Sequence, residues 1–256
     1  MFDLGRSFLA SVERRPQATA IADGTLHKSY ETWFRDIQSV ALALEGFGLS
    51  KGDRLLVIMQ NRWQMATLHW ACQFAGIIVT PVNWRSTAQD LEFFITDTEA
   101  RAVAYDESAS EAVQNCSSAR SLVRITSGQI EDPDAHDFDS LLGNRGDTIL
   151  RATAEDLSLM LYTSGTSGKP KGVPRLHRAE RSAALAHVAQ NLYRHDECTL
   201  GVMPLYHTMG VRSLLSMALV DGKFVCIPKF DPKETLDAIE REQISNLYLV
   251  PTLYHM

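Results

Sequence analysis

The chain has 256 residues, of which 45% are hydrophobic, and its 25 Lys and Arg against 31 Asp and Glu give a formal net charge of −6. This is the composition of an ordinary globular protein, and it excludes a disordered or a collagen-like chain. The acidic balance also argues against a nucleic-acid coat protein, which would normally be basic.

The first 104 residues alternate between helical and strand patterns. Apolar residues at helical spacing predict helices over residues 2–14, 32–47, 63–74 and 87–96. Short apolar runs predict strands over 19–21, 25–27, 53–59, 77–82 and 101–104. Gly48 offers a cap for the second helix, because glycine adopts a positive φ at little cost. Strands that are apolar on both faces and alternate with helices indicate a mostly parallel sheet with helices on both sides, so the predicted class is α/β.

The second half of the chain continues this pattern after an interruption. Residues 127–139 are rich in acids and lack an apolar period, so we interpret them as a surface loop or a connection between subdomains. Strands are then predicted over 157–162, 200–203, 224–227 and 244–249, and helices over 178–192, 211–220 and 233–241. Asp231 can cap the last helix, with Pro232 in its first turn and Glu234 completing a capping box. We expect an N-terminal subdomain over 1–150 and a second subdomain over 151–256.

The most informative segment is 162–174, YTSGTSGKPKGVP, which directly follows a predicted strand. Its glycines let backbone N–H groups approach an anion, and its hydroxyl groups add further hydrogen-bond donors. Lys169, Lys171 and the arginines at 175, 178 and 181 lie nearby, opposed locally only by Glu180. Composition alone also fits a plain surface loop, but the order of strand, glycine–hydroxyl loop and paired lysines favours a polyphosphate site.

Two familiar phosphate loops do not fit this segment. A Walker A loop needs the pattern G-x-x-x-x-G-K-[ST], whereas position 163 is threonine and Pro170 follows Lys169. The dinucleotide pattern G-x-G-x-x-G fails as well, because the glycines fall at 165, 168 and 172.

Residues 163–172, TSGTSGKPKG, resemble the AMP-binding signature of the adenylate-forming superfamily, which contains acyl-CoA synthetases, adenylation domains and luciferases. Residues 52–54 with 81–85 resemble the N-terminal subdomain of acyl-CoA synthetases, and 203–210, MPLYHTMG, resemble the segment that lines their acyl pocket. The resemblance runs the whole length of the chain. It implies the fold of the front part of the large N-terminal domain of these enzymes, with layered helices and mostly parallel sheets.

The resemblance implies an ATP-dependent carboxylic acid:CoA ligase, which forms an acyl-adenylate and then an acyl-CoA. ATP, Mg²⁺ and CoA are the implied cofactors of the whole enzyme, with no metal ligand expected in this chain. His207 matches the position beside the acyl group and is the implied catalytic residue, although a core histidine is the alternative; His177 and His195 are expected at the surface. The residues implied to bind the ATP phosphates are Thr163, Ser164, Gly165, Thr166, Ser167, Gly168, Lys169 and Lys171.

The family's later motifs for adenine, ribose and magnesium, and its mobile C-terminal domain, have no counterpart here. We therefore expect a fragment that is inactive by itself. Residues 204–210 resemble those of ligases for aromatic or cycloaliphatic acids. The alternatives are a medium- or long-chain fatty acyl-CoA ligase, an adenylation domain that loads a carrier protein, and a non-catalytic nucleotide-binding module.

The expected partners are a carboxylic acid, ATP and CoA, without nucleic acid, and a homodimer is left open. No stretch approaches the roughly 18 uninterrupted apolar residues of a membrane-spanning helix. The four widely spaced cysteines lack the close pairs that bind zinc and favour a reducing compartment, so we expect a cytoplasmic protein.

Overall fold

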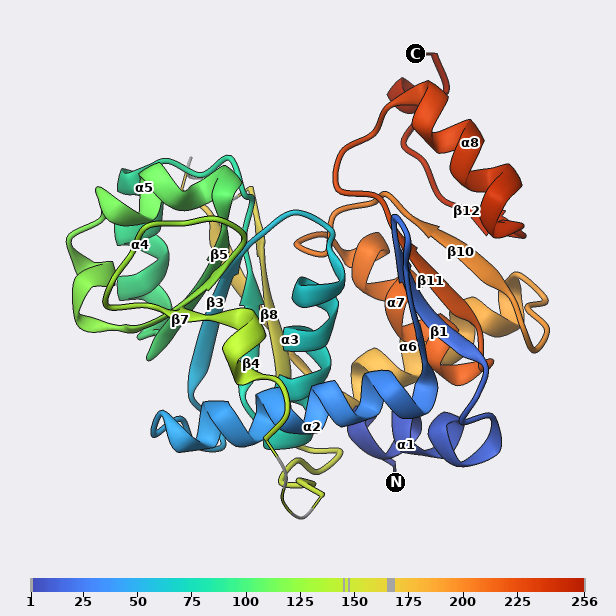
Figure 1. Cartoon of the computed structure of the whole chain (residues 1–256), viewed down its shortest axis with the longest axis horizontal. Coiled ribbons are helices and arrows are strands. Elements are labelled where there is room, and N and C mark those ends of the chain that lie inside the picture. The colour runs from blue at the N-terminus through green and yellow to red at the C-terminus, as the bar shows by residue number, and fades with distance from the viewer. Residues whose placement is uncertain (1, 145, 147, 165–168, 256) are drawn as a thin grey trace.

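The computed structural model describes residues 2–144, 146, 148–164 and 169–255, and these form helices around two sheets (Figure 1). The strands are β1 (Thr19–Asp23), β2 (Leu26–Ser29), β3 (Arg54–Ile58), β4 (Ile78–Pro81), β5 (Ala102–Asp106), β6 (Val123–Ser127), β7 (His136–Asp137), β8 (Leu157–Thr163), β9 (Lys171–Leu176), β10 (Cys198–Gly201), β11 (Lys223–Cys226) and β12 (Asn246–Leu247). The α-helices are α1 (Leu4–Arg14), α2 (Tyr30–Gly46), α3 (Trp63–Ala75), α4 (Ala88–Thr98), α5 (Ser110–Gln114), α6 (His177–Gln190), α7 (Thr208–Leu219) and α8 (Pro232–Glu242). The predicted α/β class is confirmed.

The larger sheet has the strand order β7-β6-β5-β3-β4-β8-β9, and all its neighbouring strands are parallel except β8 and β9. Its central strand β3 is apolar on both faces. Leu55 and Val57 join the core cluster that contains α2 and α3, whereas Leu56 and Ile58 join the cluster that contains α4 and α5. Helices therefore cover both faces of this sheet, as the continuous apolar runs predicted (Figure 1).

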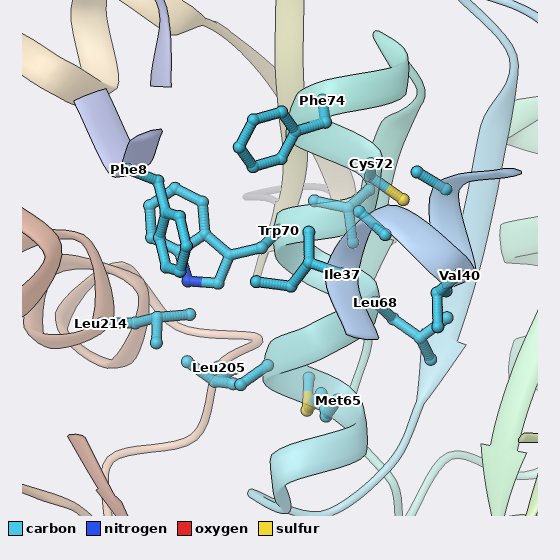
Figure 2. Close-up of a cluster of buried hydrophobic side chains, with 14 of the residues drawn as sticks. Phe8, Ile37, Val40, Met65, Leu68, Trp70, Cys72, Phe74, Leu205 and Leu214 are labelled. Carbon is cyan, nitrogen blue, oxygen red and sulfur yellow. The ribbon is translucent and has the colours of Figure 1, made fainter. Parts of the chain in front are cut away.

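The smaller sheet has the order β12-β10-β11-β1-β2, with β2 antiparallel and the others parallel. One buried cluster joins it to the larger sheet: Phe8 of α1 packs on Trp70 of α3 with ring centroids 4.7 Å apart, and Leu205 and Leu214 approach from the side of α7 (Figure 2). Trp33 completes the cluster and donates its indole N–H to Thr67 at 2.8 Å. This shared core holds the two sheets as one packed unit.

Each sheet contains strands from both sides of residue 150. The hairpin β1–β2 pairs with β11, and β8 lies beside β4. The expected boundary between residues 150 and 151 therefore does not separate the two sheets, and it stays a prediction about subdomains.

The structure refines one local prediction and corrects another. Most residues of 127–139 are exposed, as expected of a surface loop. The segment 127–139 contains the short strand β7, and its Asp132 accepts hydrogen bonds from Arg124 Nε at 2.8 Å and Tyr105 Oη at 2.6 Å. These contacts pair an acid that looked solvent-exposed in the sequence. His195 is exposed as expected. His177 is instead fully buried, because the first turn of α6 packs against α1, and the His177 ring accepts a hydrogen bond from the Leu4 N–H.

The helix ends follow their predicted caps in part. Gly48, with φ of +86°, lies two residues after the end of α2 and donates its N–H to the Glu45 carbonyl at 2.9 Å. Asp231 accepts a hydrogen bond from the Glu234 N–H at the start of α8, whereas the reciprocal bond of a capping box is not formed among the described residues. Within the described part of the chain, no helix combines the length and apolar character needed to cross a membrane.

Candidate functional site

The predicted phosphate segment lies at the end of an antiparallel hairpin where β8 leads into β9. Strand β8 ends at Thr163, which pairs with Lys171 at the start of β9. Lys171 therefore belongs to a strand, where the sequence predicted a loop, because residues 171–176 return along β8 and complete the sheet edge. Gly165, Thr166, Ser167 and Gly168 lie outside the described residues.

The described residues of this segment present hydroxyl groups and positive charge to solvent. The side chains of Thr163, Ser164, Lys169 and Lys171 are all exposed. Neither lysine has an ion-pair partner among the residues that the structure describes. Exposed ammonium groups beside hydroxyl donors suit a polyanion such as a triphosphate.

The three nearby arginines are engaged elsewhere, contrary to the simple count of charges in the sequence. Arg175 Nη1 contacts Glu180 at 3.1 Å, Arg178 Nε contacts Glu155 at 2.8 Å, and Arg181 Nε donates to Ser7. The lysines are therefore the residues of this group that are available to a phosphate.

The end of β8 is anchored to α4. The Tyr162 ring lies 4.6 Å from the Phe94 ring, and its hydroxyl donates to Asp97 at 2.6 Å. Partial burial, together with the bond to Asp97, raises the pKa of the Tyr162 hydroxyl. The hydroxyl therefore stays protonated near neutral pH and keeps donating to Asp97.

A pocket of about 400 Å³ contains the predicted catalytic residue His207. This volume lies in the range of small-molecule sites, about 300–1,000 Å³. Most of the lining is aromatic or aliphatic, and the charged groups at it are Arg85 and Lys229. The lining residues come from four segments: Trp84 and Arg85; Val202, Met203, Pro204, Tyr206 and His207; Pro228, Lys229 and Phe230; Val250 and Leu253.

His207 stands directly before α7 and lines this pocket. Its ring lies 4.5 Å from the Tyr206 ring, and the residue is exposed. Partial desolvation lowers the pKa of the imidazole, so the ring is neutral near pH 7. A neutral imidazole offers one N–H donor and one nitrogen acceptor to a ligand in the pocket.

Two cations stand beside the apolar walls of the pocket. The Arg85 guanidinium stacks on Trp84, 3.8 Å from the ring centroid, and Lys229 is exposed. Neither has a carboxylate partner in the part of the chain that the structure describes. An anionic ligand is therefore attracted to this pocket. Lys229 and Phe230 were not predicted as site residues, although their position just after a predicted strand was a usable signal.

Strand direction brings the hairpin and the pocket to one edge of the fold. β4 and β8 are parallel neighbours, with Val79 opposite Leu159, so residues 84–85 and the phosphate segment follow adjacent strand ends. The remaining pocket segments follow the carboxyl ends of β10, β11 and β12. Ligands of open α/β sheets typically bind at the carboxyl ends of the strands.

Two hollows of more than 600 Å³ share no lining residue with this pocket. One, of about 660 Å³, lies between the β1–β2 hairpin and the ends of β3, β5 and β6, where Asp23 and Asp106 already accept hydrogen bonds from the chain. The other, of about 670 Å³, lies beside α2. Neither holds a residue of the predicted site.

The family is shown by direct comparison. The family model described as AMP-binding enzyme matches residues 8–256, so the chain belongs to this family. This confirms the resemblance inferred from the residues around the phosphate segment.

Known relatives extend the comparison. The chain is 27% identical to a feruloyl-CoA synthase of an Amycolatopsis species over 240 residues, which cover 93% of this chain and 47% of that protein. It is 27% identical to an indoleacetate–CoA ligase of Aromatoleum aromaticum, with 94% and 48% covered. It is 23% identical to a long-chain-fatty-acid–CoA ligase of Mycobacterium tuberculosis, with 95% and 48% covered. The chain thus spans about half the length of the curated relatives it matches.

Solved structures share the fold. The N-terminal domain of FACL13 from Mycobacterium tuberculosis, bound to an inhibitor, superposes with a TM-score of 0.90 at 20% identity, over 100% of this chain and 64% of that one. ATP-bound MatB from Rhodopseudomonas palustris superposes with a TM-score of 0.85 at 26% identity, over 99% and 50% of the two chains.

Proposed function

We propose that this chain is the N-terminal part of an ATP-dependent carboxylic acid:CoA ligase that acts on an aromatic or cycloaliphatic acid. In the reaction, a carboxylate oxygen attacks the α-phosphorus of ATP and the bond to pyrophosphate breaks. The thiol of CoA then displaces AMP from the acyl-adenylate. The observation that carries the proposal is that exposed hydroxyls and lysines of the β8–β9 hairpin share an edge with an aromatic pocket.

The charges of the substrates explain why the ATP phosphates need positive groups of their own in this site. A carboxylate must approach a polyanionic triphosphate, so the phosphate charge has to be screened. Lys169, Lys171 and the hydroxyls of Thr163 and Ser164 would bind the phosphates, together with residues 165–168. Fixed donors aimed at developing charge supply on the order of 3–4 kcal/mol each in the best cases. Mg²⁺ bound to ATP would neutralise further charge.

The pocket supports a compact acid. Its aromatic lining and its volume of about 400 Å³ suit a ring better than an extended chain. Arg85 and Lys229 would attract the carboxylate, and the neutral ring of His207 would lie beside the acyl group. The feruloyl and indoleacetate ligases among the relatives also act on aromatic acids, according to their names. A fatty acid is the second candidate substrate, because a long-chain-fatty-acid–CoA ligase of Mycobacterium tuberculosis is also among the relatives.

The same proposal places the protein in the cytoplasm. All four cysteines are free and buried, as is usual in a reducing compartment. The proposed substrates, ATP and CoA, are consistent with this location.

Acid-dependent ATP–pyrophosphate exchange tests the proposal. The assay compares this chain and the whole protein with benzoate, cyclohexanecarboxylate and octanoate. We expect exchange from the whole protein with a ring acid and none from this chain alone. Stronger exchange with octanoate would reassign the substrate to a fatty acid. Absence of exchange with every acid would reject the ligase and favour a nucleotide-binding module.

Replacing Lys171 tests the phosphate site. Lys171→Ala in the whole protein is expected to lower kcat/KM for ATP about ten- to hundredfold, because a positive charge at the phosphates is lost. The side chain is exposed and the strand pairing uses only the backbone, so the unfolding midpoint is expected to stay near that of the wild type. Lys233→Ala, at an exposed lysine of α8, is the matched control. Unchanged ATP kinetics with a large loss of stability would contradict the phosphate role.

A further inference from the structure

The strongest unassigned feature is the way in which one wall of the pocket is held. We call residues 201–208, which lead from β10 into α7, the pocket segment; it includes the pocket residues Met203, Tyr206 and His207. It follows a strand of the smaller sheet. Two side chains from the larger sheet contact this segment: Asn61, which follows β3, and Arg175, which belongs to β9.

Asn61, three residues after the end of β3, makes three hydrogen bonds to the backbone of the pocket segment. Its Nδ2 group donates to the carbonyl oxygens of Gly201 and Met203, both at 2.8 Å, and its Oδ1 accepts from the Leu205 N–H at 3.0 Å. The side chain is 4% exposed, so water replaces these bonds poorly. An aspartate of the same size could keep the bond to Leu205 but would turn an oxygen toward two carbonyls.

A second contact holds the other end of the segment. Arg175 of β9 donates from Nη2 to Thr208 Oγ1 at 2.8 Å, while its Nη1 faces the buried carboxylate of Glu180 at 3.1 Å. Arg175 and Lys171 lie on the same strand, so this contact joins the phosphate hairpin to the first residue of α7.

The start of α7 also packs closely on the pocket segment. A Cβ atom at Gly210 would lie 2.2 Å from the Pro204 carbonyl oxygen and 2.5 Å from that of Met203. The absence of a side chain at this position therefore lets the helix rest against the segment. Backbone atoms, Asn61 and Arg175 together leave the segment little room to move.

We propose that Asn61 is a positioning residue for the acid pocket, and that the Arg175–Thr208 contact supports it. The three bonds of Asn61 set the path of the backbone that carries Tyr206 and His207. This inference rests on the proposed function and adds to it a residue outside the pocket that controls acid binding. Loss of the bonds would loosen the acid site, whereas the phosphate hairpin, which makes no hydrogen bond to Asn61 among the described residues, would keep its affinity for ATP.

Steady-state kinetics of the whole protein test whether acid binding weakens while ATP binding does not. Asn61→Asp is expected to raise KM for the acid about ten- to hundredfold, since misplacement of a site by about 1 Å has effects of this size. KM for ATP is expected to change less than about twofold. Thr208→Val removes only the hydroxyl and keeps the shape of a partly exposed residue, so it folds even if Asn61→Asp does not. It is expected to raise KM for the acid about threefold.

Tyr30→Phe is the matched control. The Tyr30 hydroxyl is buried and donates to the carbonyls of Met217 and Gly222, at the far end of α7. Its removal also costs buried hydrogen bonds to backbone and lowers stability, but both KM values are expected to stay near those of the wild type. A rise of both KM values together in Asn61→Asp, or an unchanged KM for the acid in Asn61→Asp and Thr208→Val, would overturn the proposal.

Amide hydrogen exchange in this chain gives a readout that does not depend on activity. The Leu205 N–H is expected to exchange at least about tenfold faster in Asn61→Ser, whose shorter side chain cannot reach this N–H, and at the wild-type rate in Tyr30→Phe. Wild-type exchange at Leu205 in the Asn61 variant would reject the positioning role whatever the activity. Absence of pyrophosphate exchange from the wild-type whole protein would instead reject the ligase, so the two failures are distinguishable.

Discussion

Replacing Glu242 with glutamine is expected to lower the free energy of unfolding by about 3 kcal/mol. The carboxylate is 3% exposed and faces Lys223 Nζ at 2.9 Å, His27 Nε2 at 3.0 Å and Arg241 Nε at 3.1 Å. Burial alone would raise its pKa, but the bonds from Lys223, His27 and Arg241 outweigh burial and lower the pKa to about 2. Glutamine removes the charge and leaves Lys223, which is only 21% exposed, without its counter-ion. Loss of one partner of a buried ion pair typically costs about 3–5 kcal/mol. The lower end of this range applies here, because the side chains of His27 and Arg241 are solvated.

Urea unfolding at pH 7 measures this effect. Glu240→Gln, at an exposed position of the same helix, is the control and is expected to stay within about 0.5 kcal/mol of the wild type. Because the pKa of Glu242 is lowered by folding, its contribution is present above the ordinary pKa and is lost as the pH falls toward 2. A loss below about 1 kcal/mol in Glu242→Gln would mean that solvent screens this network.

Acidification from pH 6.5 to 4.5 is expected to destabilise the protein through two buried histidines. His69 is 2% exposed and His177 fully buried. Burial, and then repulsion from His177, lowers the pKa of His69 to about 3. Burial lowers the pKa of His177 to about 4, although the carboxylates of Asp3 and Asp156 oppose this shift and Lys51 adds to it. Protonation of His177 at Nδ1 would also break the bond that this atom accepts from the Leu4 N–H.

The sign follows from proton counting. Between these pKa values and the ordinary value of 6.5, the unfolded chain binds more protons than the folded one, so stability falls as the pH falls. Each histidine contributes about 1.4 kcal/mol per pH unit at most, so the two together contribute at most about 3 kcal/mol per pH unit. Glu242 and Asp132, with pKa values of about 2, lose most of their contributions at lower pH. His187 and His207, whose pKa values are also lowered by partial desolvation, add smaller contributions between pH 6.5 and 4.5.

His69→Leu isolates the contribution of His69. Urea unfolding at several pH values between 4.5 and 6.5 is expected to show a slope that is smaller by up to about 1.4 kcal/mol per pH unit, because leucine cannot bind a proton. His136→Gln, at an exposed position of β7, is the control and is expected to keep the wild-type slope. An equal slope in His69→Leu and the wild type would mean that His69 is protonated in the folded protein.

The sequence predicted the local elements well because their signals are local. Helices α1, α2, α3, α4, α7 and α8 and strand β3 lie within a few residues of their predicted bounds, since a repeated apolar period depends only on neighbouring positions. The short strand β6 and helix α5 were missed, because neither is long enough for a clear period. The strand β9 was hidden by the glycine-rich segment that precedes it.

The candidate site divides in the same way. The order of glycines, hydroxyl residues and lysines from 163 to 172 identified the family, because the residues of this phosphate segment are neighbours in the sequence. That Arg175, Arg178 and Arg181 face Glu180, Glu155 and Ser7 could not be predicted, because each contact depends on how the elements pack.

The sequence by itself determined the α/β class, the order of most elements and the family. Only the tertiary structure decided that β1 lies beside β11, that His177 is buried, and that Asn61 holds a backbone segment about 140 residues away. The physical reason is that an apolar period indicates only which face of a helix or strand is buried against another part of the protein. Which partner covers it, and which polar groups then meet across the contact, depends on packing between segments far apart in the chain.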